Sequence, residues 1–440
     1  MSGDETLVNE KPGSAGASSI AANRLRWSIV GLLSLASVIN YLDRATLSVS
    51  LPLIARDFNL GPAEQGVLLS AFFWSYALMQ VPIGWAADRL SMRWLYVVTF
   101  TLWSLAQGLA GAAKSFIVLL GTRILLGIGE SIYLPGGTKI VTLFFPREKR
   151  GLPSGLFDFG TRIGMSLGGI LVPTLLVFLG WRITFEIIGF AALLWLIPWL
   201  ATYPAHLPAQ ISAPPERAPR PDEAAKRSFR RAANITGVIF NRNLLGICLG
   251  FFCFDYYWYL FVTWLPDYLV TVRHFTVLRA GLYSAAPFLV FGVCEPIGGW
   301  IADRLIVLGW NETRVRKGMV TLAFFTGLLL IPAEYVASAK EAVWLIIGAS
   351  LVGLSSGNLI VILQSCAPPE QVGLWTGFEN FFGNVAGILA PLATGLLIAR
   401  TGSYSPGFDL AALVLVAGLA SYWFLVGDLK KPESAESRAS

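Results

Sequence analysis

Apolar runs long enough to cross a membrane as helices recur along this whole chain. Its mean hydropathy is +0.62 over 440 residues, and 55% of the residues are hydrophobic whereas 14% are charged. A helix needs about 20 apolar residues to cross a hydrocarbon core of roughly 30 Å. The runs are too long and too uniformly apolar for the alternating strands of a membrane barrel. The sequence therefore predicts an all-α integral membrane protein and excludes an ordinary soluble enzyme.

The chain has room for about twelve transmembrane helices in two groups of six. We expect spans at residues 27–55, 66–87, 94–112, 115–137, 151–179, 183–203, 244–272, 278–302, 316–338, 342–366, 371–399 and 405–427. A proline-rich, basic connection separates the sixth from the seventh. The predicted organisation is a disordered cytoplasmic tail (1–23), an N-terminal six-helix half (24–203), a cytoplasmic linker (204–242), a C-terminal six-helix half (243–430) and a cytoplasmic tail (431–440).

Basic residues are distributed unevenly among the predicted loops. Most Lys and Arg lie in the linker, near the two termini and in the loops on the same side of the membrane. The positive-inside rule makes that side cytoplasmic, so we expect both termini inside and a multi-pass protein of the inner (cytoplasmic) membrane. This asymmetry explains the net charge of +6 and favours membrane lipid, not nucleic acid, as a partner. The basic stretch 229–240 fits an amphipathic helix on anionic lipid and a solvated linker about equally well.

Two sequence repeats indicate that the halves have a similar layout. Residues 84–90 read GWAADRL and residues 299–305 read GWIADRL. Residues 151–159 read GLPSGLFDF and residues 373–381 read GLWTGFENF, at a similar offset. Self-similarity at a fixed offset is the signature of a duplicated unit. We therefore expect two related half-molecules.

These features together resemble the major facilitator superfamily over nearly all of residues 24–430. They are the two six-span halves, the basic linker, and a Gly-x-x-x-Asp-Arg loop after the second and the eighth span. Four further segments resemble the anion:cation symporters of that superfamily: 40–44 (NYLDR), 70–76 (SAFFWSY), 123–130 (RILLGIGE) and 380–384 (NFFGN). Members of that family carry sugar acids, tartrate, phthalate, sialic acid or phosphate. The resemblance implies the major facilitator fold and transport of an anion.

The sequence excludes a Walker-type nucleotide site and a proton relay through histidine. No Gly-x-x-x-x-Gly-Lys-Ser/Thr segment occurs, so no nucleotide site of that type can be built and a gradient must supply the energy. The only histidines, His206 and His274, fall in the linker and in an outer loop and cannot relay protons across the membrane. Carboxylates within the spans must therefore do such work. The candidates are Asp43, Glu130, Asp158, Asp255, Glu295 and Glu379, with Arg44, Arg123, Lys139 and Arg162 as intramembrane cations.

Asp43, Arg123 and Glu130 are expected at mid-membrane depth. Arg123 and Glu130 are two helical turns apart, so they share one helix face and can both reach a charge on the first span. This favours a switchable ion-pair network over a static, self-neutralising pair, because a static pair can be replaced by apolar residues at little cost. The family resemblance implies that Asp43 and Glu130 carry the coupling protons. It also implies that Arg44 and Arg123 meet the anionic substrate or hold these acids ionised.

Arg162 has two alternative partners. Asp158 precedes it by four residues, in the order favoured for an ion pair within one helix. Mutual neutralisation is the first interpretation, and a cavity-facing Arg162 that binds a second acidic end of the substrate is the alternative. Asp255 and Glu295 have no evident partner within their own helices, and they remain weak candidates.

Several polar side chains are candidates for recognising substrate hydroxyl groups. They are Tyr41, Tyr76, Tyr257, Gln364 and Asn380, and the resemblance supports Tyr41, Tyr76 and Asn380 most. For Tyr257 and Gln364 ordinary helix packing is the favoured interpretation. The run 256–259 covers every face of a helix, so its members cannot all line one cavity.

The repeated loop also predicts a gate. Asp88, with Gly84 and Arg89, sits at a helix end, where a carboxylate can accept N–H bonds from the start of an adjacent helix and lock one state. Asp303 and Arg304 repeat the arrangement. The loop departs from the usual superfamily form at Ser91, which replaces a glycine and leaves the strength of this latch open.

We interpret the chain as a secondary transporter that co-transports protons with a small organic anion, such as a sugar acid, by alternating access. Sodium-coupled or exchange transport of an inorganic anion such as phosphate is the alternative. An integral-membrane enzyme is a remote alternative, because no metal-ligand cluster or nucleophile–base pair is visible. The expected partners are the anion, protons and lipid, with no cofactor and no metal, in a monomer.

Overall fold

The computed structural model describes residues 14–205 and 240–429, and every regular element within these ranges is a helix. Ten described stretches are long and apolar enough to cross a membrane. One of them, Arg147–Thr202, folds back on itself and supplies two crossings, and Met92–Gly111 is an additional helix of 20 residues. The twelve crossings expected from the sequence are therefore present in an all-helical fold.

The N-terminal half comprises α1 (Ser14–Phe58), α2 (Pro62–Arg89), α3 (Met92–Gly111), α4 (Phe116–Glu130), α5 (Tyr133–Phe144), η1 (Arg147–Lys149), α6 (Gly151–Ala192), η2 (Leu193–Trp195) and α7 (Leu196–Thr202). Within α6, Gly180 has φ 74° and ψ 171°, a conformation that interrupts the helix and that glycine adopts without steric cost. The chain turns back there, between the fifth and sixth expected spans. α1 starts at Ser14, inside the segment 1–23 expected to be disordered, where an alanine-rich sequence favours helix.

The C-terminal half comprises α10 (Arg242–Thr271), α11 (Val277–Val307), α12 (Glu312–Gly327), α13 (Leu330–Tyr335), α14 (Ala339–Ala349), η3 (Ser350–Ser355), α15 (Ser356–Cys366), η4 (Pro369–Gln371), α16 (Val372–Thr401) and α17 (Ser405–Phe424). The ninth expected span is divided between α12 and α13, and the tenth between α14, η3 and α15. Large apolar side chains such as Leu78, Ile117 and Phe178 are exposed on the outside of the bundle. An apolar outer surface is what contact with lipid requires.

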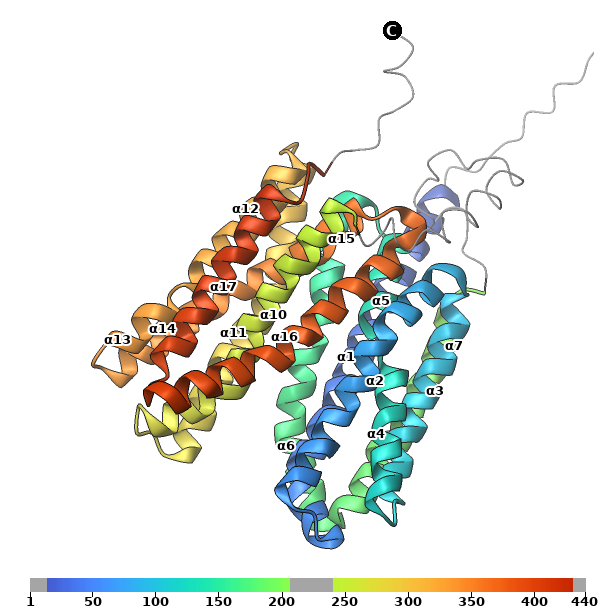
Figure 1. The fold of residues 1–440 in the computed structure, drawn as a ribbon. Helices are drawn as coiled ribbons and strands as arrows, with labels where there is room; N and C mark the ends of the chain where they lie inside the picture. The colour runs from blue at the N-terminus through green and yellow to red at the C-terminus, as the bar shows by residue number, and fades with distance from the viewer. Residues whose placement is uncertain (1–13, 206–239, 430–440) are drawn as a thin grey trace, which may run out of the picture.

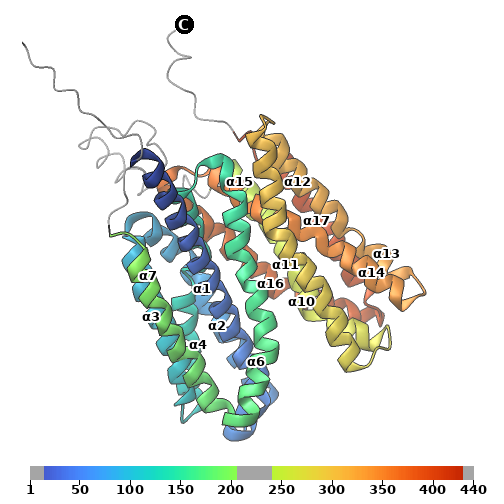
Figure 2. The same cartoon turned by 180° about the vertical axis from the view of Figure 1, so that it is seen from behind.

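The two halves lie close together at one end of the molecule and diverge toward the other (Figures 1 and 2). The described chain begins and ends at the end where they meet, which we call the terminus end. The opposite end is called the far end. Contacts between the halves are made mainly by α2 against α16 and by α6 against α11. The structure is therefore closed at the terminus end.

Two pairs of glycines allow these helices to touch backbone to backbone. A Cβ atom added to Gly84 of α2 would lie 2.2 Å from the carbonyl oxygen of Gly373 of α16. A Cβ atom added to Gly299 of α11 would lie 2.2 Å from the carbonyl oxygen of Gly151 of α6. All four glycines belong to the repeated segments. The duplication thus builds the same close crossing twice.

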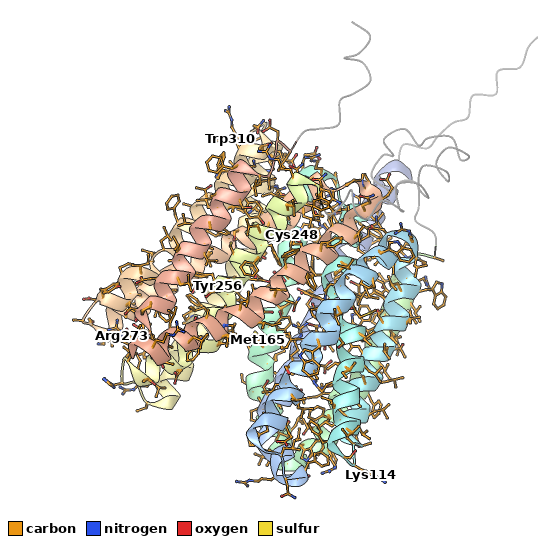
Figure 3. All side chains as sticks on the ribbon, in the orientation of Figure 1. Lys114, Met165, Cys248, Tyr256, Arg273 and Trp310 are labelled. Carbon is orange, nitrogen blue, oxygen red and sulfur yellow. The ribbon has the colours of Figure 1, made fainter. Side chains whose placement is uncertain are left out.

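We expect Gly84→Ala to destabilise the conformation that is closed at the terminus end, because its new methyl group meets a backbone atom that cannot move aside. Overpacking of this kind costs about 1–3 kcal/mol. The measurement is the distance between spin labels at the exposed far-end positions Lys114 (labelled in Figure 3) and Lys340, which should shorten as the far end closes. Gly66→Ala in the same helix meets nothing within 4 Å and is the control. Unchanged distances in Gly84→Ala would contradict the prediction.

Candidate functional site

Asp88 joins the two halves at the terminus end. Its carboxylate accepts hydrogen bonds from the backbone N–H groups of Gly373 (2.9 Å) and Leu374 (2.8 Å), in the first turn of α16. Lys139 of α5 donates to the same carboxylate at 2.8 Å and to the carbonyl oxygen of Pro369 at 2.7 Å. Lys139 was expected among the intramembrane cations, but it belongs to this contact. A carboxylate at a helix N-terminus is stabilised by the unpaired N–H groups there.

Asp303 of the C-terminal half makes the equivalent contact with the N-terminal half. Its two oxygens accept hydrogen bonds from the N–H groups of Gly151 and Leu152, both at 3.0 Å, in the first turn of α6. Arg316 pairs with it at 2.6 Å. The repeated loop therefore supplies two latches related by the duplication, with a different cation in each.

The arginines that follow these aspartates are not part of the latches. Arg89 and Arg304 are exposed, and the Arg89 guanidinium lies 4.3 Å from the ring of Trp85. Their positions suit contact with solvent and lipid headgroups at the membrane surface.

Further contacts seal the terminus end between the halves. Arg147 pairs with Glu312 at 2.8 Å. Gln364 donates from Nε2 to the carbonyl oxygen of Thr138 (3.3 Å) and to Ser154 Oγ (3.4 Å). Gln364 was a candidate for substrate contact, with helix packing as the favoured interpretation. It packs at this contact between the halves, because its helix presents that face to the N-terminal half.

A central cavity lies between the two halves. It brings together five of the predicted substrate-contacting residues, Tyr41, Arg44, Tyr76, Arg162 and Asn380. The other lining residues are Tyr133, Leu134, Asp158, Phe251, Phe254, Asp255, Trp258, Tyr259, Ser356, Ile360 and Asn384. Asn380 donates to the hydroxyl oxygen of Tyr76 at 3.2 Å, so polar groups of both halves already meet here. The cavity is concave and aromatic, with a few charged groups, as small-ligand sites usually are.

Arg44 is the cation on the N-terminal side of the cavity. Its Nε donates to Glu130 Oε2 at 3.0 Å, and its guanidinium lies 4.6–4.7 Å from the rings of Tyr41, Phe72 and Tyr76. One of its terminal nitrogens, Nη2, is buried without a hydrogen-bond partner among the described residues. Arg44 therefore retains the capacity to bind an acceptor.

Asp43 and Arg123 lie behind the cavity. Asp43 is fully buried; one carboxyl oxygen accepts a hydrogen bond from Trp103 Nε1, and the other has no described partner. Arg123 is also buried, and its Nε and Nη1 have no hydrogen-bond partner in the described chain. Within this network Glu130 pairs with Arg44. Direct substrate contact was one expectation for Arg123, which does not line the cavity in this conformation.

Arg162 pairs with Glu295 and not with Asp158. Its Nη2 lies 2.8 Å from Glu295 Oε1, both side chains are buried, and the guanidinium lies 3.7 Å from the ring of Trp258. Asp158 instead accepts hydrogen bonds from the hydroxyl groups of Tyr133 and Ser356. The expected pair within one helix is thus replaced by a pair across the halves, because α11 places a carboxylate closer to Arg162. Glu295 was a weak candidate from the sequence, and neither the repeats nor helix spacing indicated that it pairs with Arg162.

Tyr257 points away from the cavity. Its hydroxyl donates to the carbonyl oxygen of Gly327 at 2.9 Å, inside the C-terminal half. Its neighbours Trp258 and Tyr259 line the cavity, so the aromatic run does face in several directions. Tyr257, a candidate for substrate contact, thus takes part in helix packing, which was the favoured interpretation from the sequence. Asp255, a weak candidate from the sequence, faces the cavity.

Within residues 14–205 and 240–429, no group of three or more His, Cys, Asp or Glu side chains is placed to hold a metal ion. The two arginines that line the cavity pair with acids that do not line it, Arg44 with Glu130 and Arg162 with Glu295. Their arrangement suits the binding of an anion beside groups that can exchange protons.

The chain matches known transporters over most of its length. Residues 33–391 match the model of the Major Facilitator Superfamily. The chain is 29% identical to the probable galactarate/D-glucarate transporter GudP of Bacillus subtilis, with 92% of this chain and 93% of GudP covered. It is 30% identical to the D-galactonate transporter of Escherichia coli O6:H1, with 93% and 97% covered.

The fold is also similar to that of a solved transporter structure. A variant of the Escherichia coli fucose:proton symporter FucP superposes with a TM-score of 0.70 at 14% identity, covering 92% of this chain and 98% of FucP. The sequence match, the two six-helix halves and the central cavity lead to one conclusion: the chain belongs to the major facilitator superfamily, and it is a membrane transporter whose relatives include transporters of sugar acids.

Proposed function

We propose that this protein is a proton-coupled symporter that carries a small sugar acid across the inner membrane by alternating access. The proposal rests on two contacts of Arg44. Its side chain lines the cavity, and it also forms an ion pair with the buried Glu130. A substrate carboxylate that binds Arg44 competes with Glu130 for the same guanidinium. Substrate binding and the charge state of a buried acid are thereby linked.

The proposed cycle follows from that competition. A proton from water in the open cavity forms an O–H bond with Glu130, which weakens its hold on Arg44 and frees the guanidinium for the substrate. Asp43 is the second acid of the network, and Arg123 acts on both acids through its charge. When the opposite side opens, the O–H bond breaks and the proton passes to water on that side. Glu130 again competes for Arg44, and the substrate leaves. The order of these steps makes uphill uptake depend on the proton gradient.

The polar groups of the cavity support a polyhydroxy acid as substrate. Tyr41, Tyr76 and Asn380 offer hydroxyl and amide groups that can exchange hydrogen bonds with sugar hydroxyls. Arg162, already held by Glu295, is a second positive group at the cavity wall. The relatives named for galactarate, D-glucarate and D-galactonate agree with this substrate class.

The latches supply the gate in this proposal. Asp88 and Asp303, with the close crossing at Gly84, hold the terminus end closed while the far end is open. Release of the N–H groups at the starts of α6 and α16 lets the halves rock. Arg89 and Arg304 hold the repeated loops at the charged membrane surface.

The proposal is tested with the purified protein in proteoliposomes. Labelled D-galactonate should accumulate against its gradient when a pH gradient, acidic outside, is imposed without sodium. A protonophore should abolish this accumulation. Accumulation that requires sodium and is unaffected by the protonophore would refute proton coupling. Chemical conversion of the D-galactonate would favour an enzyme.

The orientation is a separate prediction. Both termini and the linker should be cytoplasmic, because the basic residues concentrate on their side. The test is a single cysteine at Ala218, which lies outside the described residues, probed in intact cells with a membrane-impermeant thiol reagent. It should react only after the cells are opened. Reaction in intact cells would reverse the assignment.

A further inference from the structure

A further buried acid, Glu379, lies on α16 in the C-terminal half, apart from Asp43 and Glu130. Its side chain is 1% exposed, and neither of its carboxyl oxygens has a hydrogen-bond partner in the described part of the chain. None of the ion pairs among the described residues involves it. A fully buried carboxyl group in this position is unusual, because buried charges are normally paired.

The groups around Glu379 do not supply a positive charge. α10 contributes Asp255 and Cys248, the latter labelled in Figure 3, and α17 contributes Tyr422. The Tyr422 hydroxyl is itself fully buried and has no described hydrogen-bond partner. Asp255 is acidic, and the cysteine and tyrosine are uncharged. An unpaired hydroxyl and an unpaired carboxyl group are therefore both buried in the C-terminal half, with no hydrogen bond between them among the described residues.

The other neighbours of α16 lie on different faces or at its start. Toward α2, Asn380 bonds to Tyr76 and Gly377 packs against the backbone of Gln80. From α5, Lys139 is held by Asp88 and Pro369 before the helix begins. No described cation reaches Glu379, so it can persist there only as a neutral, protonated acid.

Asp255 connects this buried group to the cavity. Asp255 lines the cavity, and its Oδ2 would lie 2.2 Å from a Cβ atom added to Gly383. Gly383 is one helical turn after Glu379, and positions with this spacing are about 5–6 Å apart on one helix face. The glycine thus leaves room for Asp255 to lie against α16 between Glu379 and the cavity.

The same helix is held by the latch. Asp88 binds the first N–H groups of α16, at Gly373 and Leu374. Glu379 lies about one and a half turns further along the same helix. Opening the latch therefore separates α16 from α2, whose residues Gln80 and Tyr76 contact Gly377 and Asn380 on either side of Glu379 in sequence. This separation changes the surroundings of Glu379. A carboxyl group that is dry in one state and hydrated in another binds its proton with different affinity in the two.

We propose that Glu379 is a second proton-binding site of the transport cycle, loaded and emptied from the cavity through Asp255. It takes its proton from cavity water by forming an O–H bond. When rearrangement of the halves hydrates the carboxyl group, that bond breaks and the proton passes to the surrounding water. Each substrate molecule is then accompanied by one proton more than the Asp43 and Glu130 network supplies. This inference rests on the proton-coupled symport proposed above.

The experiment measures the number of protons carried per D-galactonate, from the membrane potential at which net flux in proteoliposomes reverses. Glu379→Gln keeps the shape of the side chain but cannot release a proton as an acid does, so the ratio should fall by one. Glu379→Asp retains an acid and should keep the wild-type ratio. Glu341→Gln, an exposed glutamate at the start of α14, is the control and should also keep it.

An unchanged ratio in Glu379→Gln overturns the inference and leaves the proposed function standing. Wild-type protein with no proton coupling overturns the proposed function itself, so the two failures are distinguishable. Should Glu379→Gln fail to fold, Glu379→Met takes its place. The infrared carbonyl band of protonated carboxyl groups provides a second readout. It should change when D-galactonate binds to the wild type, and it should lose one component in Glu379→Met. A band that is insensitive to D-galactonate overturns the inference.

Discussion

Asp43→Asn and Glu130→Gln should each abolish the uphill accumulation of substrate that a pH gradient drives. Each substitution removes a carboxyl group that is buried behind the cavity without a full set of partners. An amide has nearly the same shape but does not bind and release a proton in the required range. The measurement is uptake of labelled D-galactonate into proteoliposomes with and without the gradient, and the expected result is equilibration without accumulation.

Binding and exchange separate this result from simple loss of folding. Glu130→Gln should still bind substrate, because Arg44 loses a competing carboxylate and keeps a neutral partner. Counterflow, in which internal unlabelled substrate drives entry of labelled substrate, should therefore survive. Exposed Glu64→Gln in α2 is a matched control and should accumulate substrate normally. Undiminished gradient-driven accumulation in both Asp43→Asn and Glu130→Gln would refute a coupling role for these acids.

Arg44→Ala should lower the affinity for the sugar acid at least about 10-fold. Removing one partner of a buried, charged hydrogen-bonded pair typically costs about 2–5 kcal/mol, and every 1.4 kcal/mol is a factor of ten in affinity. Arg44→Lys should also weaken binding, because a lysine cannot bind a carboxylate through two parallel hydrogen bonds or stack equally well between Tyr41 and Tyr76. Calorimetry with D-galactonate measures both variants.

Two comparisons sharpen the Arg44 prediction. Arg217→Ala, in the linker, should leave the affinity unchanged. Arg123→Ala should impair transport more than binding, since Arg123 lies behind the cavity and acts through Asp43 and Glu130. Wild-type affinity in Arg44→Ala would contradict the anion site, and so would a best ligand that carries no charge.

Much of the local arrangement around Arg44 could be expected from the sequence. The short segments 40–44, 70–76 and 380–384 resemble a known family, and they supply Tyr41, Arg44, Tyr76 and Asn380, which meet at the cavity. The repeat around Gly84 and Asp88 likewise indicated a carboxylate at the start of another helix. These contacts could be predicted because each depends on local residue spacing or on a residue, such as glycine, that a particular backbone contact requires.

The partners of the other charged groups could not be expected. The sequence placed Asp158 beside Arg162, yet Glu295 of the other half binds it. Tyr257 and Gln364 had suitable depth, but the rotation of their helices directs them elsewhere. Such rotations are weakly encoded in a membrane protein, because the lipid-facing and the protein-facing sides of a helix are both apolar.

By itself the sequence determined that the chain is a twelve-span helical membrane protein of duplicated layout with acids and arginines at mid-membrane depth. Length, hydropathy and repeats are sufficient for this, because the bilayer requires continuous apolar helices. Only the tertiary structure decided that Arg44 pairs with Glu130, that Arg162 pairs with Glu295, and that Glu379 is buried without a partner. These pairings depend on how six-helix halves pack against each other, and long-range packing of that kind leaves no periodic signal in the chain.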